Sequence, residues 1–202
     1  MTEQQTKNRE RFISLLKATN RENIDYVIED LDSWGFFEAP ASSRNHFNFP
    51  GGLAEHSLNV YDMAMAVKES LVKLRPDVEA KLPEDSIAIA ALLHDVCKTN
   101  IYKRVTRKQK NEIGIWEDVE SYDVDYSVLP LGHGEKSVIM LLQSGLDLSD
   151  DEMFAIRWHM GAWDLPAQSI EMDKNYRKAN EKTPLVSLIH TADTLAAAIL
   201  EK

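Results

Sequence analysis

Residues 87–98, IAIAALLHDVCK, form the most apolar stretch of the sequence and indicate its central element. An almost unbroken apolar run is preceded by a proline and two acidic residues at positions 83–85. Proline at the first helical position and acidic groups in the first turn both favour a helix start. A helix that is apolar on every side is buried. We therefore predict a central buried helix from Pro83 to Val96 that carries the adjacent His94 and Asp95.

Hydrophobic residues recur at helical spacing in several other segments, whereas two segments break the pattern. The predicted helices are two within residues 1–35, one over 53–73, one around 138–142, one over 151–160 and one over 183–200. The turn-rich residues 37–52 predict a long loop, and alternating apolar residues predict a hairpin. The sequence thus predicts an all-α helical bundle with a small β-hairpin insertion near residues 101–125, in one domain spanning 1–202.

Composition restricts the class of protein. The chain has 202 residues, is 44% hydrophobic and 28% charged, and contains only 8 glycines and 7 prolines, as expected of a soluble globular domain. Its net charge of −10 disfavours long duplex nucleic acid. Cys97 is the single cysteine and the first 17 residues are polar. We expect a reducing, cytoplasmic setting without a membrane anchor.

Polar groups stand where helices should be apolar. These positions are His56, the pair His94 and Asp95, His159, and His190 with Asp193. A single buried histidine is usually hydrogen-bonded core. An ionised Asp95 inside an apolar helix, however, costs several kcal/mol unless a cation meets it. A divalent metal accounts for all of these residues together, because imidazoles and carboxylates are its usual ligands.

The order of these residues resembles the HD superfamily of metal-dependent phosphohydrolases. The resemblance rests on His56, on the His-Asp pair in ALLHDVCK and on Asp193 in LIHTADTLAAA, and it covers residues 45–200. The segments RNHFNFPGGLAEHSLNV, GHGEKSV and RWHMGAWDLP are similar to the branch that includes bacterial 3′-to-5′ exoribonucleases. In a chain of 202 residues, we expect no room for the oligonucleotide-binding domain that those enzymes also carry. We therefore expect small nucleotides or short oligonucleotides as substrates.

The resemblance also implies a ligand set. It assigns His56, His94, Asp95 and Asp193 to one ion, and His133 and His159 to a second ion that Asp95 bridges. One or two divalent ions are expected, with Mn, Fe, Zn, Mg, Ni and Co all open. Alternatively, His133 is an exposed turn residue between two glycines. We expect His190 to orient Asp193 from one helical turn away.

The expected metal site also gives chemical roles to further residues. A pair of ions can clamp a phosphate and activate water. Asp95 and Lys98 are the predicted catalytic residues, Lys98 because a position four residues after His94 shares its helical face. Lys98 can equally be a solvated lysine at a helix end.

Substrate contacts are expected from residues outside the ligand set. We expect Trp163 to stack on a base, and Arg44 and His46 to approach the substrate from the 37–52 loop. Arg104 and Arg107 belong to a basic run over residues 103–110, which is either a flap shielding the metal and attracting phosphate or a solvated face.

The predicted function is hydrolysis of a phosphoester in a nucleotide or short oligonucleotide. Two alternatives remain open from the sequence. One is a nucleotide-binding regulatory module without catalysis, and the other is a di-iron oxygenase, because histidine and carboxylate ligands also suit iron.

Overall fold

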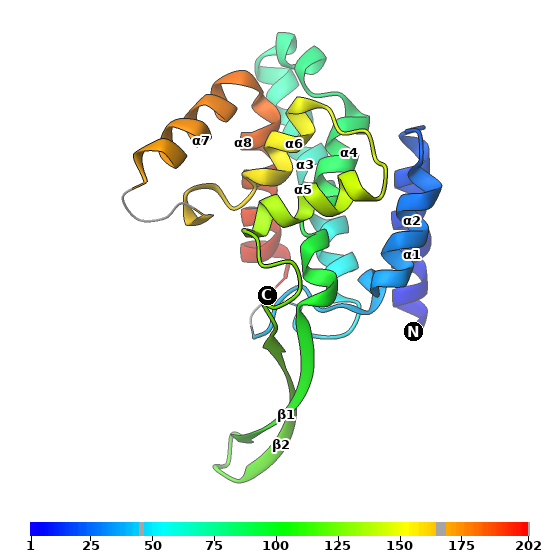
Figure 1. Ribbon diagram of the computed structural model, residues 1–202, viewed down its shortest axis with the longest axis vertical. Helices are drawn as coiled ribbons and strands as arrows, with labels where there is room; N and C mark the ends of the chain where they lie inside the picture. Colours follow the sequence, from blue (N-terminus) through cyan, green and yellow to red (C-terminus); the bar gives the residue numbers. More distant parts are fainter. Residues whose placement is uncertain (45–46, 165–168, 202) are drawn as a thin grey trace.

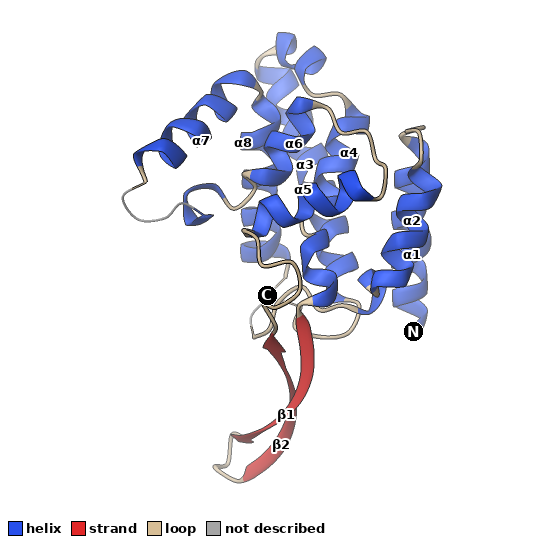
Figure 2. Cartoon of the chain, in the orientation of Figure 1, coloured by secondary structure: helices blue, strands red, loops and turns tan. Residues whose placement is uncertain are grey.

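A computed structural model describes residues 1–44, 47–164 and 169–201. The chain forms a helical body from which one two-stranded ribbon projects (Figures 1 and 2), as the sequence predicts. The α-helices are α1 (Glu3–Ala18), α2 (Ile24–Trp34), α3 (Gly52–Leu74), α4 (Glu84–Leu93), α5 (His133–Gln143), α6 (Asp150–Arg157), α7 (Ile170–Lys182) and α8 (Pro184–Leu195). The strands are β1 (Tyr102–Lys110) and β2 (Trp116–Val124). Short 3₁₀ segments span Phe36–Glu38, Pro76–Lys81, Val96–Asn100 and Gly161–Asp164, and a π-helical turn spans Ala196–Leu200.

Helix α4 is the centre of the core. Every residue of α4 from Ser86 to Leu93 is buried, and the helix packs against α1, α3, α6 and α8. It ends at Leu93, three residues earlier than predicted, and Pro83 caps it instead of forming its first turn. The chain then turns through Asp95 into a 3₁₀ segment, so the expectation that Lys98 shares an α-helical face with His94 is wrong.

The first two helices join the same hydrophobic core. Phe12 of α1 contacts Phe36 and Phe37, with ring centroids 5.0 and 5.4 Å apart. Both the break after α1 and the glycine that ends α2, Gly35, lie where the sequence predicts them. Gly35 adopts φ = 77°, a left-handed conformation that favours glycine.

Helix ends follow capping chemistry in the second half of the chain. Ser149 and Glu152 form a reciprocal capping box that opens α6, as predicted, although α6 ends at Arg157. Helix α7 was not predicted, because it is strongly polar and only Ala179 is buried along it. Without an apolar stripe, a helix leaves no periodic signal in the sequence.

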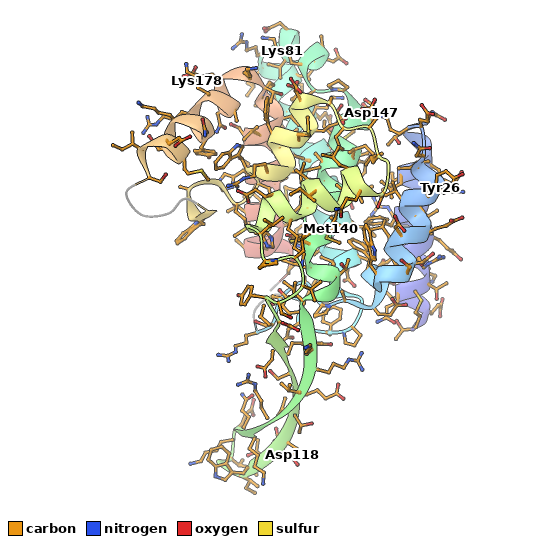
Figure 3. The ribbon with its side chains drawn as sticks, viewed as in Figure 1. Tyr26, Lys81, Asp118, Met140, Asp147 and Lys178 are labelled. Atoms are coloured by element: carbon orange, nitrogen blue, oxygen red, sulfur yellow. The ribbon has the colours of Figure 1, made fainter. Side chains whose placement is uncertain are left out.

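The hairpin is confirmed, but it does not cover the helical body. Strands β1 and β2 pair antiparallel, from Tyr102 opposite Val124 to Lys110 opposite Trp116. The ribbon extends away from the helices, and Asp118 lies at its far end (Figure 3). The predicted flap therefore does not shield the core, and only the base of the ribbon adjoins it.

The charge of the basic run is also balanced. Strand β1 carries Lys103, Arg104, Arg107, Lys108 and Lys110, and β2 carries Glu117, Asp118, Glu120 and Asp123. Arg107 forms an ion pair with Asp123, and Lys103 lies 2.5 Å from Asp125. Opposite charges across a two-stranded ribbon stabilise the pairing.

Among the described residues, no single helix is both long and apolar enough to cross a membrane. Helices α7 and α8 meet that test only when they are combined with the turn to Leu200, and they bend by 104°.

Candidate metal centre

Five parts of the chain bring the predicted ligands to one buried point. His56 comes from α3, His94 and Asp95 from the end of α4, His133 from the start of α5, His159 from the turn after α6, and Asp193 from α8. Asp95 is the meeting point. Its carboxylate oxygens lie 2.5 Å from His133 Nε2, 3.3 Å from His94 Nε2, 3.4 Å from His159 Nε2 and 3.7 Å from His56 Nε2. His56 Nε2 also lies 3.2 Å from Asp193 Oδ1.

Two of the histidines are held in the tautomer that binds metal. His94 Nδ1 donates to the carbonyl of Ala91 at 2.8 Å, and His159 Nδ1 donates to the carbonyl of Ile156 at 2.7 Å. In the neutral ring the lone pair then lies on Nε2. Among the described residues, both buried Nε2 atoms lack a hydrogen-bond partner. A buried polar atom without a partner is costly, so these residues fit a metal ion.

His56 is oriented by a carboxylate that the sequence pattern does not predict, that of Glu201. Its Nδ1 lies 2.9 Å from Glu201 Oε1, and Asn59 donates to the same oxygen at 3.2 Å. Glu201 is buried because the π-helical turn after α8 turns it inward. Its position near the end of the sequence, after an apolar run, carries no signal of this role.

His133 is the first residue of α5 and not an exposed turn residue. Its Nε2 faces Asp95, and its Nδ1 lies 3.4 Å from the buried sulfur of Cys97. Gly134 permits this placement, because a Cβ there would come within 2.1 Å of the carbonyl oxygen of Arg157. The glycine thus lets α5 approach α6 and brings the rings of His133 and His159 to a centroid separation of 5.2 Å.

Both carboxylates of the centre stay ionised. Burial would raise the pKa of Asp95, but Lys98, His94 and His133 outweigh it and hold that pKa well below its usual range. Burial opposes ionisation of Asp193 in the same way, and the hydrogen bond from His56 lowers its pKa. The centre therefore combines permanent negative charge with a ring of imidazoles.

Burial and the nearby carboxylates also shift the pKa values of the imidazoles and of Lys98. Burial would lower the pKa of His56, yet Asp193 and Glu201 raise it to about 9. Burial likewise opposes charge on His133, and Asp95 raises its pKa to about 10. For His159, burial dominates and lowers the pKa. The Nζ of Lys98 lies 2.5 Å from Asp95 Oδ2, which raises the pKa of Lys98 against the effect of burial. Lys98 is therefore a member of the centre, with 13% of its side chain exposed, and not a solvated lysine at a helix end.

A cavity of about 230 Å³ opens beside the centre. Its lining includes Asp95, Lys98, Asp193, Trp163 and His190. Trp163 is 88% exposed at this cavity, where a flat ligand can reach it. His190 does not act on Asp193 as expected, because its Nδ1 donates to the carbonyl of His159 at 2.6 Å.

The other predicted substrate contacts lie apart from this cavity. Arg44 and Arg107 line a groove of about 440 Å³ between the 37–52 loop and the ribbon. Arg104 is exposed on β1, opposite Tyr122. His46 lies outside the described residues.

The fold and the buried cluster define a helical domain built around a His-Asp pair. A family model described as the HD domain matches residues 53–198, and the chain belongs to that family. The match leaves out α1 and α2.

One curated relative is the dihydroneopterin 2′,3′-cyclic phosphate phosphodiesterase of Methanocaldococcus jannaschii, which is 30% identical over 92 residues. The aligned region is 46% of this chain and 33% of the relative, so the chain spans about a third of that protein. No solved structure matches significantly.

Proposed function

We propose that the protein is a divalent-metal-dependent phosphohydrolase that cleaves a phosphoester of a nucleotide or short oligonucleotide. The observation that carries the proposal is the position of Asp95, an ionised buried carboxylate at which the Nε2 atoms of four histidines converge. Membership of the HD family supports it, as does the relative, whose name describes a phosphodiesterase acting on a cyclic phosphate.

Following the resemblance to the HD superfamily, we assign the residues to two ligand groups that share Asp95. His56, His94, Asp95 and Asp193 would hold one ion, and His133 and His159 would hold a second ion with Asp95. Such ions supply a Lewis acid for the phosphate and lower the pKa of a bound water. Imidazole and carboxylate ligands suit Mn, Fe, Zn, Co or Ni.

Lys98 provides the fixed positive charge of the cavity. It forms an ion pair with Asp95 and lines the same cavity, so it can neutralise a phosphate oxygen as charge develops during hydrolysis. The carbonyl partners of His94 and His159 hold those rings in place throughout. These two rings then need no reorientation during the reaction.

Trp163 is the proposed contact for a base. Its exposed indole lies at the cavity that contains Lys98 and Asp193, so a nucleotide can place its phosphate at one end and its base on the indole. Arg44, His46, Arg104 and Arg107 are proposed contacts for further phosphates of a longer substrate.

The test pairs elemental analysis with hydrolysis of dinucleotides and mononucleotides in Mn²⁺. In Asp95→Asn, which keeps the side-chain size, we expect metal loss and a fall in kcat/KM of about a thousandfold or more. Asp118→Asn, at the far end of the ribbon, is the matched control. Full activity in Asp95→Asn contradicts the proposal, and bound metal without turnover on any substrate favours a regulatory module.

The groove beside the ribbon has its own test. Because Arg44 and Arg107 line a different cavity from Asp95, the double alanine variant should raise KM for oligonucleotides but not for dinucleotides. Lys174→Ala/Lys178→Ala on α7 removes equal charge as a control. An unchanged oligonucleotide KM would assign the basic run to stabilising the ribbon.

A further inference from the structure

His190 is a histidine of the cavity that no ligand group uses. It is half-buried on α8, one turn before Asp193, and lines the cavity of about 230 Å³ with Lys98 and Trp163. Its position places it beside whatever that cavity binds.

The ring of His190 is firmly held. Nδ1 donates to the carbonyl of His159 at 2.6 Å. The ring also packs on Gly161, where an added Cβ would come within 2.6 Å of His190 Cε1. Gly161 has φ = 58°, so both its backbone and this close contact favour glycine. The imidazole is thus fixed by the turn that carries His159.

This arrangement leaves one acceptor for a ligand. With Nδ1 acting as the donor, the neutral ring carries its lone pair on Nε2. Within the described part of the chain, no hydrogen bond to His190 Nε2 is found. A preorganised acceptor favours a ligand that carries a hydrogen-bond donor. In a ribonucleotide, the ribose hydroxyl is a donor that lies next to the phosphoester.

We propose that His190 accepts a hydrogen bond from the ribose 2′-hydroxyl of the substrate, so that the site prefers ribonucleotides to deoxyribonucleotides. This inference rests on the proposed function. A phosphate beside Lys98 and a base on Trp163 leave the sugar between them, in the cavity that His190 also lines. Sites built to bond a hydroxyl discriminate against the analogue that lacks it, because the protein group then loses its partner.

The test compares the dinucleotide ApA with its counterpart lacking the 2′-hydroxyl next to the phosphodiester. The measured quantity is the ratio of the two kcat/KM values. We expect the unmodified protein to prefer ApA about five- to tenfold, the effect of one hydrogen bond.

Two variants distinguish between two roles of His190, which are binding of the substrate 2′-hydroxyl and positioning of His159. In His190→Asn, the amide nitrogen can replace Nδ1 as donor to His159, but the side chain is too short to replace Nε2. In His190→Gln, the amide reaches the Nε2 position but leaves the Nδ1 position empty. We expect the ratio of the two kcat/KM values to be close to one in His190→Asn. In His190→Gln, we expect part of the preference for ApA to remain.

The opposite order would overturn the inference, since it would assign His190 to positioning alone. A ratio near one in the unmodified protein, or an equal loss on both dinucleotides in His190→Asn, would overturn it as well. Where no turnover occurs, calorimetry of the manganese-loaded protein gives the ratio of the two Kd values. A ribose preference in Kd, with no hydrolysis of either dinucleotide or of mononucleotides, would refute the proposed hydrolysis and keep the contact of His190 with the 2′-hydroxyl as a binding property.

Discussion

Each imidazole of the centre is fixed through its Nδ1 atom, but the partners differ in kind. His94 and His159 both bond the carbonyl three residues earlier, at the ends of α4 and α6. The last carbonyls of a helix lack helical partners, so the helix end itself supplies this support. His56 instead depends on Glu201, 145 positions away in the chain.

Glu201 should therefore affect the metal affinity of the centre without itself binding the metal. Glu201→Gln keeps the side-chain size but removes the negative charge beside His56 Nδ1. We expect metal affinity to fall about 10- to 100-fold, as for other residues that orient metal-binding histidines. Competition with a chromophoric chelator measures the affinity. Glu181→Gln, exposed on α7, is the control, and equal affinities in both variants would contradict the assignment.

Metal binding should release protons at neutral pH. In the metal-free protein the pKa of His56 is raised to about 9 and that of His133 to about 10, so both rings are protonated at neutral pH. A metal ion needs the neutral imidazole, so its binding displaces those protons and its apparent affinity falls as pH falls.

Titration calorimetry in two buffers of different ionisation enthalpy counts the protons released. Binding heats that are independent of the buffer would show that His56 and His133 are already neutral in the metal-free protein.

The close approach of α5 to α6 depends on Gly134. An alanine Cβ would overlap the carbonyl oxygen of Arg157, which is backbone and cannot rotate away. We expect Gly134→Ala to separate the two helices, lower the free energy of unfolding by about 1–3 kcal/mol and reduce the second metal equivalent.

Calorimetry and elemental analysis measure the two effects. Gln143→Ala, exposed at the other end of α5, should change neither. Normal metal content in a destabilised Gly134→Ala variant would separate the helix contact from the placement of His133.

The elements differ in how much of them the sequence predicts. Helix α3 follows from the spacing of its buried stripe, helix α4 follows from a continuous apolar run, and the hairpin follows from alternation. Helix α7 does not, since its one buried residue, Ala179, gives no period. The early end of α4 was also not predicted, because Val96 continues the apolar run although the helix has already ended.

The candidate site is predictable only in part, because some of its contacts leave no local pattern in the sequence. Its histidines and aspartates are unusual in apolar surroundings, and that contrast is visible in the sequence. Three other features are not visible in the sequence, because each depends on how distant segments pack. They are the position of Glu201, the contact of Cys97 with His133 and the hydrogen bond from His190 to His159. The charge balance of the ribbon likewise depends on the pairing of β1 with β2.

The centre joins α3, α4, α5 and α8, so metal binding should stabilise the whole domain. An ion that binds only the folded chain adds about 4 kcal/mol at a thousand times its Kd. For a domain of this length, 1 kcal/mol corresponds to about 2–4 °C in Tm. We therefore expect chelation to lower Tm by about 8–16 °C and readdition of Mn²⁺ to restore it.

The same scan on Asp95→Asn separates metal binding from other effects of the chelator. Without the shared carboxylate the variant should hold little metal, so the chelator should hardly move its Tm. In the stripped parent, Asp95 still faces Lys98 and the four histidines, whereas the variant lacks that carboxylate, so we expect the variant to unfold below the stripped parent. Equal Tm values for loaded and stripped parent, with removal verified by elemental analysis, would show that the cluster holds the helices together without metal.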